Sequence, residues 1–350
     1  MISFSKHIIL VSLILSGSFA VAQDWHFSQF NKAPILINPA AAGSFQGDYR
    51  ANANYKNQWS GVGTPYRTMA FSCDMPILRN FNGYKSTGAG ISVFRDKAGK
   101  SGYGFTQVNL SISQGVGVTR FQELSVGLSV GYGQVSADLS NLRWDNQYNG
   151  VEHDPSLPSL ETVYLPKSTY LDFAAGGLLR IFSDSRNPTE SSIGFSISHL
   201  TRPWSGTLSE LNNDNLQMKY ILHGRSEIPF GKYGDPLIIP TALVAIQGAS
   251  TEIIGGVNVK GYLGFNSQYT NYFNKNYYLV GLKYRYQDAI IVSIGYEWRD
   301  MLQANISYDV NFSTLSAASQ ARGGIELSLV WQGDFVRNSR SVKTVRGGRF

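Results

Sequence analysis

The chain has 350 residues and a formal net charge of +6, and charged residues make up only 15% of it, whereas soluble domains usually contain roughly 25%. Glycine occurs 36 times, aromatic residues make up 13%, and the single cysteine, Cys73, excludes an intramolecular disulfide. Beyond the amino-terminal region no run of about 18 apolar residues occurs, which excludes a spanning helix there. This composition is typical of a transmembrane β-barrel, and nothing in it predicts a cofactor or nucleic-acid binding.

Residues 1–22 predict a signal peptide. Lys6 lies in a short polar start, an apolar run follows over residues 8–15, and the small-x-small stretch AVA ends at Ala22. We expect cleavage between Ala22 and Gln23, with export of the mature chain to the outer membrane. The alternative is a retained membrane anchor, which the short apolar run disfavours.

Residues 23–49 do not alternate as a strand does. They contain FSQFNKAPILINPAAAGSF, with Pro34, Pro39 and a run of small residues that ends at Gly43. Proline removes a donor from a strand ladder, so we expect a separate N-terminal periplasmic or lumen segment, ordered on or inside the barrel mouth. The alternative is a loose leader strand.

Residues 50–332 predict the barrel, because short segments of alternating polar and apolar residues follow one another between turn residues. An even number of strands brings both chain ends to the periplasmic side, so the predicted fold is a closed, antiparallel outer-membrane β-barrel of about 14 strands. The strands are expected near residues 50–59, 66–74, 86–96, 103–115, 122–135, 169–182, 191–200, 216–228, 238–248, 251–262, 277–286, 289–298, 302–310 and 322–331.

The stretch NYYLVGLKYRY, residues 276–286, illustrates the alternation. Tyr278 and Leu282 fall on one face, whereas Lys283 and Arg285 fall on the other. A soluble sandwich would alternate as well, with its apolar faces packed between two sheets. Strands of roughly nine to eleven residues and aromatic residues at strand ends favour a membrane barrel. These aromatic residues are Tyr132, Tyr286, Trp298 and Trp331.

The polar faces of the predicted strands would line the lumen. Their mixed charges would either line the path of a channel or pair with one another and plug it. The candidate lumen cluster consists of Lys283, Arg285, Glu297, Asp309 and Glu326.

Loop lengths predict the topology. If the first strand starts in the periplasm, the longest connection, residues 138–168, lies outside, as do residues 201–215 and 311–321. Long external loops and short periplasmic turns are the rule for such barrels. The candidate partner-binding residues of these loops are Trp144, Tyr148, His153, Trp204 and Leu315.

Residues 333–350 predict a basic periplasmic tail. It follows the last strand and contains no acidic residue after Asp334. A docking segment for other proteins and a disordered, solvated tail are both open at this point. The candidate docking residues are Arg337, Arg340, Lys343, Arg346 and Arg349.

No catalytic or metal-binding pattern stands out. The mature chain has four histidines, His26, His153, His199 and His223, and none has the spacing of a metal ligand set. The sequence G-x-S-x-G does not occur, and the glycine-rich pieces lack the lysine and helix of a phosphate loop. The sequence therefore predicts that the protein is not an enzyme; a barrel hydrolase built on His199 or His223 is a remote alternative.

Three stretches carry a family resemblance. FSQFNKAPILINPAAAG covers residues 27–43, YKNQWSGVGTPYRTMAFSCDMPI covers residues 55–77, and SYDVNFSTLSAASQARGGIELSLVW covers residues 307–331. They resemble the opening, the Q-W block and the ending of the PorP/SprF family of type IX secretion system membrane proteins. Each motif is weak singly and specific in combination, and the resemblance extends over nearly the whole mature chain.

The resemblance implies an outer-membrane barrel of Bacteroidota that assists secretion, in some members the surface anchoring of large gliding adhesins. The implied partners are the C-terminal domain of a secreted surface protein, the periplasmic ring or peptidoglycan-linked components, and the lipid bilayer. It supplies no catalytic residues. Asn38, Pro39, Gln58, Trp59 and Asp309 would either fix the N-terminal segment in the lumen or contact the partner. The alternative function is a passive channel or small-solute transporter.

Overall fold

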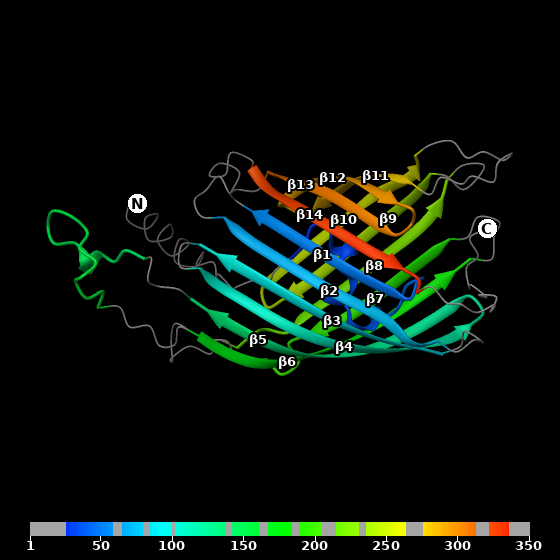
Figure 1. The fold of residues 1–350 in the computed structure, drawn as a ribbon, viewed down its shortest axis with the longest axis horizontal. Helices are drawn as coiled ribbons and strands as arrows, with labels where there is room; N and C mark the ends of the chain where they lie inside the picture. Colours follow the sequence, from blue (N-terminus) through cyan, green and yellow to red (C-terminus); the bar gives the residue numbers. More distant parts are fainter. Residues whose placement is uncertain are drawn as a thin grey trace, which may run out of the picture.

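The computed structural model describes most of the chain after its amino-terminal region. Within these residues, fourteen strands form one closed antiparallel barrel, as the sequence predicted (Figure 1). None of the helices described is long and apolar enough to cross a membrane. The described residues are 26–58, 65–79, 85–99, 102–137, 142–160, 167–183, 189–204, 215–230, 236–263, 276–312 and 322–335.

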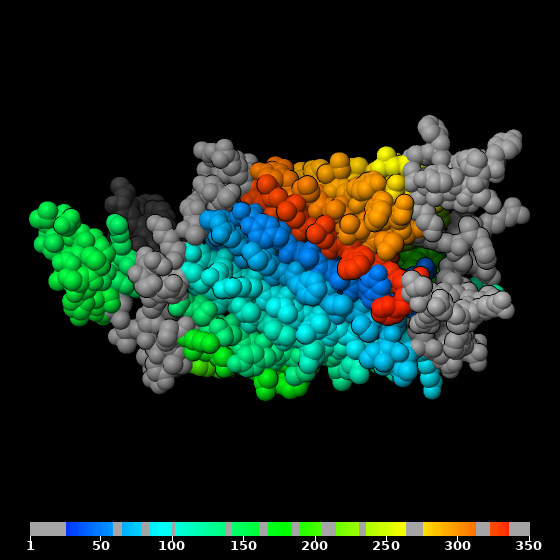
Figure 2. All heavy atoms as spheres, in the orientation of Figure 1, coloured from blue at the N-terminus to red at the C-terminus, as the bar shows by residue number. Residues whose placement is uncertain are grey.

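Each strand pairs with the next one along the chain, and the last pairs with the first. In Figure 2 the blue and red strands at this closure lie side by side in one unbroken wall. The strands are β1 Tyr49–Gln58, β2 Tyr66–Arg79, β3 Lys85–Ala98, β4 Tyr103–Thr119, β5 Gln122–Ser136, β6 Lys167–Phe182, β7 Glu190–Ser198, β8 Lys219–Pro229, β9 Leu237–Gln247, β10 Ser250–Tyr262, β11 Tyr277–Arg285, β12 Ala289–Trp298, β13 Leu302–Asn311 and β14 Arg322–Gly333.

Several strands are longer than the sequence indicated. β2 continues to Arg79 and β4 to Thr119, and β4 reaches 17 residues. The expected length of roughly nine to eleven residues reflects only the stretch that crosses the hydrocarbon layer. Backbone pairing with the neighbouring strands continues beyond that stretch, interrupted by irregularities at Pro76/Leu78 and Gly117/Thr119.

The barrel is apolar outside and carries many polar residues inside, although the inward-facing Ile221, Leu243 and Ile291 are apolar and form a buried cluster with Phe30 and Ile37. On β11, Leu282 and Tyr284 face outwards and are exposed, whereas Lys283 and Arg285 face inwards and are buried. The same arrangement recurs on β12, where Ile294 is 64% exposed. In water this arrangement would be unfavourable, because apolar surface gains free energy by leaving water. The strands are therefore built for lipid on their outer side.

The lipid-facing position of Ile294 leads to a first prediction. Ile294→Arg is expected to lower the free energy of unfolding by about 2–4 kcal/mol, because Ile294 lies in the middle of β12, where charge is most costly in a bilayer. Urea unfolding of the barrel folded into lipid vesicles measures this difference. Ile294→Leu is the control and should leave stability unchanged. Equal stability of both variants would contradict a lipid-facing outer surface.

Candidate functional site

Residues 26–48, here called the lumen segment, lie inside the barrel (dark blue in Figure 1). They form three short helical turns, η1 Phe30–Lys32, α2 Pro34–Ile37 and η2 Pro39–Ala41. Pro34 and Pro39 each occupy the first turn of a helix, where the missing N–H has no cost. The segment is short and turns repeatedly, so it satisfies many of its backbone groups locally and through the barrel wall.

The lumen segment runs opposite to β1. The carbonyl oxygen of His26 accepts a hydrogen bond from Lys56 Nζ at 3.3 Å, close to the last residues of β1. The Asp48 N–H donates to the carbonyl of Gly333 at 2.8 Å, beside the first residue of β1. The segment thus extends from the loop end of the barrel, where β5 is joined to β6 (left in Figure 1), to the end at which β1 starts.

Glu326 of β14 fixes the start of the lumen segment. Its carboxylate accepts hydrogen bonds from the N–H groups of Ser28 at 2.7 Å and Gln29 at 2.9 Å. The Gln29 amide also donates to Ser307 at 3.1 Å and accepts from Ser328 at 2.9 Å. Glu326 is fully buried, so each of these bonds forms away from water, where charge-assisted bonds are strong.

Asp309 lies next to this carboxylate and is surrounded by cations. Its Oδ2 atom is 3.1 Å from Arg285 Nη2, 3.8 Å from Lys56 Nζ, and accepts a hydrogen bond from Ser28 Oγ at 2.7 Å. Lys283 Nζ donates to the Ser28 carbonyl at 3.2 Å. The group of Lys56, Lys283, Arg285, Asp309 and Glu326, here called the charged cluster, therefore pairs internally and binds the lumen segment.

Four of the five predicted lumen residues lie in the charged cluster, and Glu297 does not. Glu297 Oε1 pairs with Lys260 Nζ at 2.6 Å, near the end of the barrel at which β1 starts. Lys56 was not among the lumen residues predicted from the sequence. A signal for it was present, because Arg50, Asn52, Asn54 and Lys56 alternate along β1 on its buried face.

Asn38 anchors the middle of the lumen segment. Its Nδ2 donates to the carbonyl of Gly177 at 2.9 Å, and its Oδ1 accepts from the N–H of Ala40 at 2.9 Å. The wall approaches closely here, since a Cβ atom on Gly127 of β5 would lie 2.4 Å from the backbone nitrogen of Ala40. A Cβ on Gly176 of β6 would lie 2.1 Å from Asn38 Oδ1. Only glycine permits this packing.

Asp74 and Arg50 anchor the far end of the lumen segment. Arg50 Nη2 lies 2.7 Å from Asp74 Oδ2 and donates to the Ala41 carbonyl at 3.1 Å. The same carboxylate accepts from the N–H of Gly43 at 2.8 Å, and the guanidinium lies 4.4 Å from the centre of the Phe45 ring. The segment is therefore attached to the wall at its start, middle and end.

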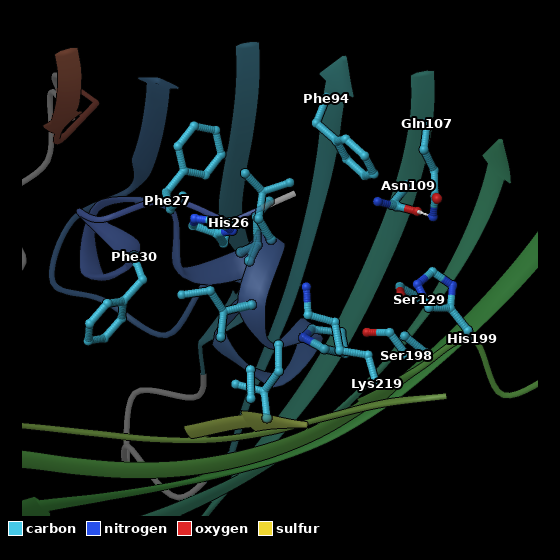
Figure 3. A pocket seen from close by; sticks show the side chains of 18 of the residues that line it. His26, Phe27, Phe30, Phe94, Gln107, Asn109, Ser129, Ser198, His199 and Lys219 are labelled. Atoms are coloured by element: carbon cyan, nitrogen blue, oxygen red, sulfur yellow. Dashed lines mark hydrogen bonds between the residues drawn. The ribbon is translucent and has the colours of Figure 1, made fainter. Parts of the chain in front are cut away.

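The lumen is not filled completely. A small cavity of about 70 Å³ lies between the lumen segment and the barrel wall, towards the loop end (Figure 3). Phe27 and Phe30 line it from the segment, and Gln107, Asn109 and His199 line it from the wall.

The connection between β5 and β6 forms a compact loop over residues 142–160. Tyr148 pairs with His153 through a β-bridge, and the Asn149 side chain accepts hydrogen bonds from two backbone N–H groups of the turn. Hydrogen bonds from Ser156 hold the pKa of Asp154 below its ordinary value. The loop nevertheless exposes large apolar side chains: Tyr148, Val151 and Leu160.

Of the other predicted loop, tail and cleavage residues, two lie within the described part of the chain. Trp144 is half-buried in the 142–160 loop, and Trp204, in the β7–β8 connection, forms a β-bridge with Asn215. Leu315 lies outside the described residues. The same holds for Ala22, Gln23, Arg337, Arg340, Lys343, Arg346 and Arg349.

Three of the histidines each have a different polar partner. His153 contacts Gln147, His223 contacts Asn38 at 3.1 Å, and His199 Nδ1 lies 2.9 Å from Asp172 Oδ2. Among the described residues, no group of three or more His, Cys, Asp or Glu side chains could hold a metal ion.

Solved structures with a similar fold are outer-membrane barrels. A TodX deletion mutant, a monoaromatic hydrocarbon channel, is 9% identical with a TM-score of 0.49, over 87% of this chain and 94% of that one. The CymD monoaromatic hydrocarbon channel is 11% identical with a TM-score of 0.46, over 91% and 96%. The translocator domain of the autotransporter NalP from Neisseria meningitidis is 10% identical with a TM-score of 0.39, over 82% and 89%. No curated protein matches the sequence.

The family comparison covers the barrel and the lumen segment together. A model of the type IX secretion system membrane protein PorP/SprF matches residues 20–331. This range includes the lumen segment, all fourteen strands except the end of β14, and the three stretches that carried the resemblance. The chain therefore belongs to the PorP/SprF family of type IX secretion system membrane proteins.

Proposed function

We propose that this barrel assists type IX secretion by binding, without catalysis, and holds a large exported protein at the cell surface through its C-terminal domain. A gliding adhesin is the kind of cargo that fits this role. The protein acts in the outer membrane, which it reaches through a cleaved signal peptide. Membership of a type IX secretion family supports the general role. The observation that carries the specific one is a lumen occupied by an attached segment, together with a loop beyond the β5–β6 end of the barrel that exposes apolar side chains (Figure 1).

The attached lumen segment supports a binding role over a transport role. Removing one partner from a buried ion pair, such as those of the charged cluster, is strongly destabilising because it leaves an uncompensated buried charge. A solute would have to displace the contacts of Glu326 with Ser28 and Gln29 to pass along this wall. The channel alternative retains one supporting observation, the small cavity beside the segment. Conductance in planar bilayers separates the two functions.

The 142–160 loop is the proposed contact for the partner. The loop end faces the outside in this proposal, as the loop lengths predict. Val151 is 86% exposed and Tyr148 is 59% exposed, and isolated apolar side chains on a hydrogen-bonded loop form an effective anchor for another protein. The β7–β8 loop with Trp204 lies at the same end. The opposite end and the basic tail would contact the periplasmic ring or peptidoglycan-linked components.

A pull-down tests this proposal. The tagged protein is isolated from outer membranes in mild detergent, and co-purifying proteins are identified by mass spectrometry. We expect a large secreted protein with a C-terminal sorting domain. The triple variant Tyr148→Ser, Val151→Ser, Leu160→Ser is expected to reduce its recovery at least about tenfold, because losing 1.4 kcal/mol of binding has that effect.

Glu152→Ser in the same loop is the matched control. Glu152 is exposed and polar, so its replacement changes no apolar contact surface and should leave recovery unchanged. Recovery of the barrel without any exported protein, while the fold is intact, would move the channel function ahead. Equal recovery with the triple variant would exclude this loop as the contact.

A further inference from the structure

Strand pairing in the barrel wall stops early at one place near the loop end. β6 pairs with β5 along its whole length, beginning with Lys167 opposite Ser136. On the other side of β6, the ladder with β7 ends at Ala175 opposite Ile197. Residues 167–173 of β6, here called the β6 edge, therefore extend beyond the neighbouring strand towards the loop end.

β7 ends because the chain turns out of the sheet directly after it. His199 and Arg202 have φ angles of 58° and 44°, which non-glycine residues seldom adopt in a strand. The His199 ring is buried inside the barrel, and its Nδ1 atom lies 2.9 Å from Asp172 Oδ2 (Figure 3). The other carboxylate oxygen of Asp172 accepts a hydrogen bond from the N–H of Phe173 at 2.9 Å. One carboxylate thus holds the turn and caps the end of the ladder.

Every second residue of the β6 edge directs its backbone groups away from β5. In a sheet, the N–H and C=O of neighbouring residues point to opposite sides. The Phe173 carbonyl accepts from the Leu200 N–H at 3.0 Å, and the Leu171 carbonyl accepts from the Thr201 hydroxyl at 3.5 Å, so the odd-numbered residues face this side. Among the described residues, no strand pairs there with the N–H groups of Leu171 and Thr169 or with the Thr169 carbonyl.

The β6 edge lies where the outer surface of the barrel leaves the lipid. Leu171 is opposite Tyr132, near the end of β5, and aromatic residues of this kind gather at membrane–water interfaces. Unpaired backbone groups are costly in hydrocarbon, whereas at the interface water or a partner can satisfy them. Barrel closure normally leaves no strand edge at all, so this one is an exception in the wall.

Apolar side chains flank the β6 edge on both sides. Leu171 and Phe173 are exposed on the outer face of β6, and Leu200 and Trp204 are exposed on the chain that follows β7. Unpaired N–H and C=O groups at strand spacing bind another extended backbone, and apolar groups beside them accept its alternate side chains. A helix does not fit, because its backbone groups already bond one another. The edge therefore matches an extended peptide.

We propose that the β6 edge is a docking site at which an extended segment of the exported protein adds to the barrel as a further strand. The identity of this partner rests on the proposed anchoring function. The 142–160 loop precedes β6 in the chain and belongs to the same end of the barrel. The loop and the edge thus form two contacts for one partner, the first through side chains and the second through backbone hydrogen bonds.

Thr169→Pro tests the docking site. Proline removes the N–H that faces the open side and places a ring there, while the ladder with β5 is retained, because proline is tolerated at a strand edge. In the pull-down from outer membranes, recovery of the exported protein is expected to fall at least about tenfold. Thr169→Ala is the matched control, since it keeps the N–H and should leave recovery unchanged. Heat-dependent mobility on gels reports whether each variant is folded.

Photo-crosslinking in living cells decides the question if Thr169→Pro fails to fold. The photoreactive residue p-benzoylphenylalanine replaces Thr169 in one variant and Ile290 in the control. Ile290 lies on the outer surface of β12, which has a paired strand on both sides. The probe at Thr169 is expected to capture one segment of the exported protein, identified by mass spectrometry of the linked peptide, and the probe at Ile290 is not.

The outcomes separate the docking site from the anchoring function. If the native barrel recovers the exported protein and folded Thr169→Pro recovers it equally, the docking site is overturned and the anchoring function stands. The same holds if the probe at Thr169 links only to the barrel itself, to a second copy of it, or to nothing. Recovery of no exported protein with the native barrel contradicts both proposals.

Discussion

Glu326→Ala is expected to lower the free energy of unfolding by about 3–5 kcal/mol, the usual result of removing one partner from a buried charged network. The loss has two sources. The N–H groups of Ser28 and Gln29 lose their acceptor, and Lys56 and Lys283 keep their positive charges in a buried site with one carboxylate fewer. Urea unfolding in lipid vesicles measures the change.

The same variant should also loosen the start of the lumen segment. Single-channel recordings in planar bilayers are expected to show a larger conductance for Glu326→Ala than for the native barrel. Glu227→Ala is the control, since Glu227 pairs with the partly exposed Arg225 and such pairs contribute about 0–1 kcal/mol. Native stability together with native conductance would show that Glu326 does not hold the segment.

Gly127→Val is expected to displace the middle of the lumen segment. The new Cβ would lie 2.4 Å from the backbone nitrogen of Ala40, and this atom belongs to backbone that cannot rotate away. Overpacking of this kind typically costs about 1–3 kcal/mol. The expected result is therefore a less stable barrel in which a protease cleaves the lumen segment faster, as measured by limited proteolysis and mass spectrometry.

Gly255→Val provides the control for this prediction. A Cβ at Gly255 of β10 meets no atom within 4 Å, so the substitution adds no clash and favours the strand conformation. Its stability and cleavage rate should match those of the native barrel. If Gly127→Val behaves in the same way, the close packing of the segment against β5 is not required for its attachment.

The fourteen strands and their two faces follow from the sequence by itself. A strand places successive side chains on opposite sides, so alternation in stretches such as residues 276–286 indicates both the strand and its polar face. The same alternation marked Lys283, Arg285, Asp309 and Glu326 as lumen residues before any pairing was known. It could not give the full lengths of β2 and β4, because backbone pairing continues where the lipid-facing pattern ends.

The sequence predicted a separate segment on or inside the barrel mouth, but the contacts of the lumen segment were decided only by the tertiary structure. Glu326 bonds Ser28 although 298 residues separate them, and Asn38 meets Gly177 across 139 residues. Such contacts depend on the closure of the whole barrel, and no local pattern of residues 26–48 encodes them. Closure also separates Glu297 from the charged cluster, since it lies towards the other end of its strand. Alternation determines which face of the barrel wall a side chain occupies. Its contact partners, and its position relative to the lumen segment, are fixed only when all fourteen strands enclose one lumen.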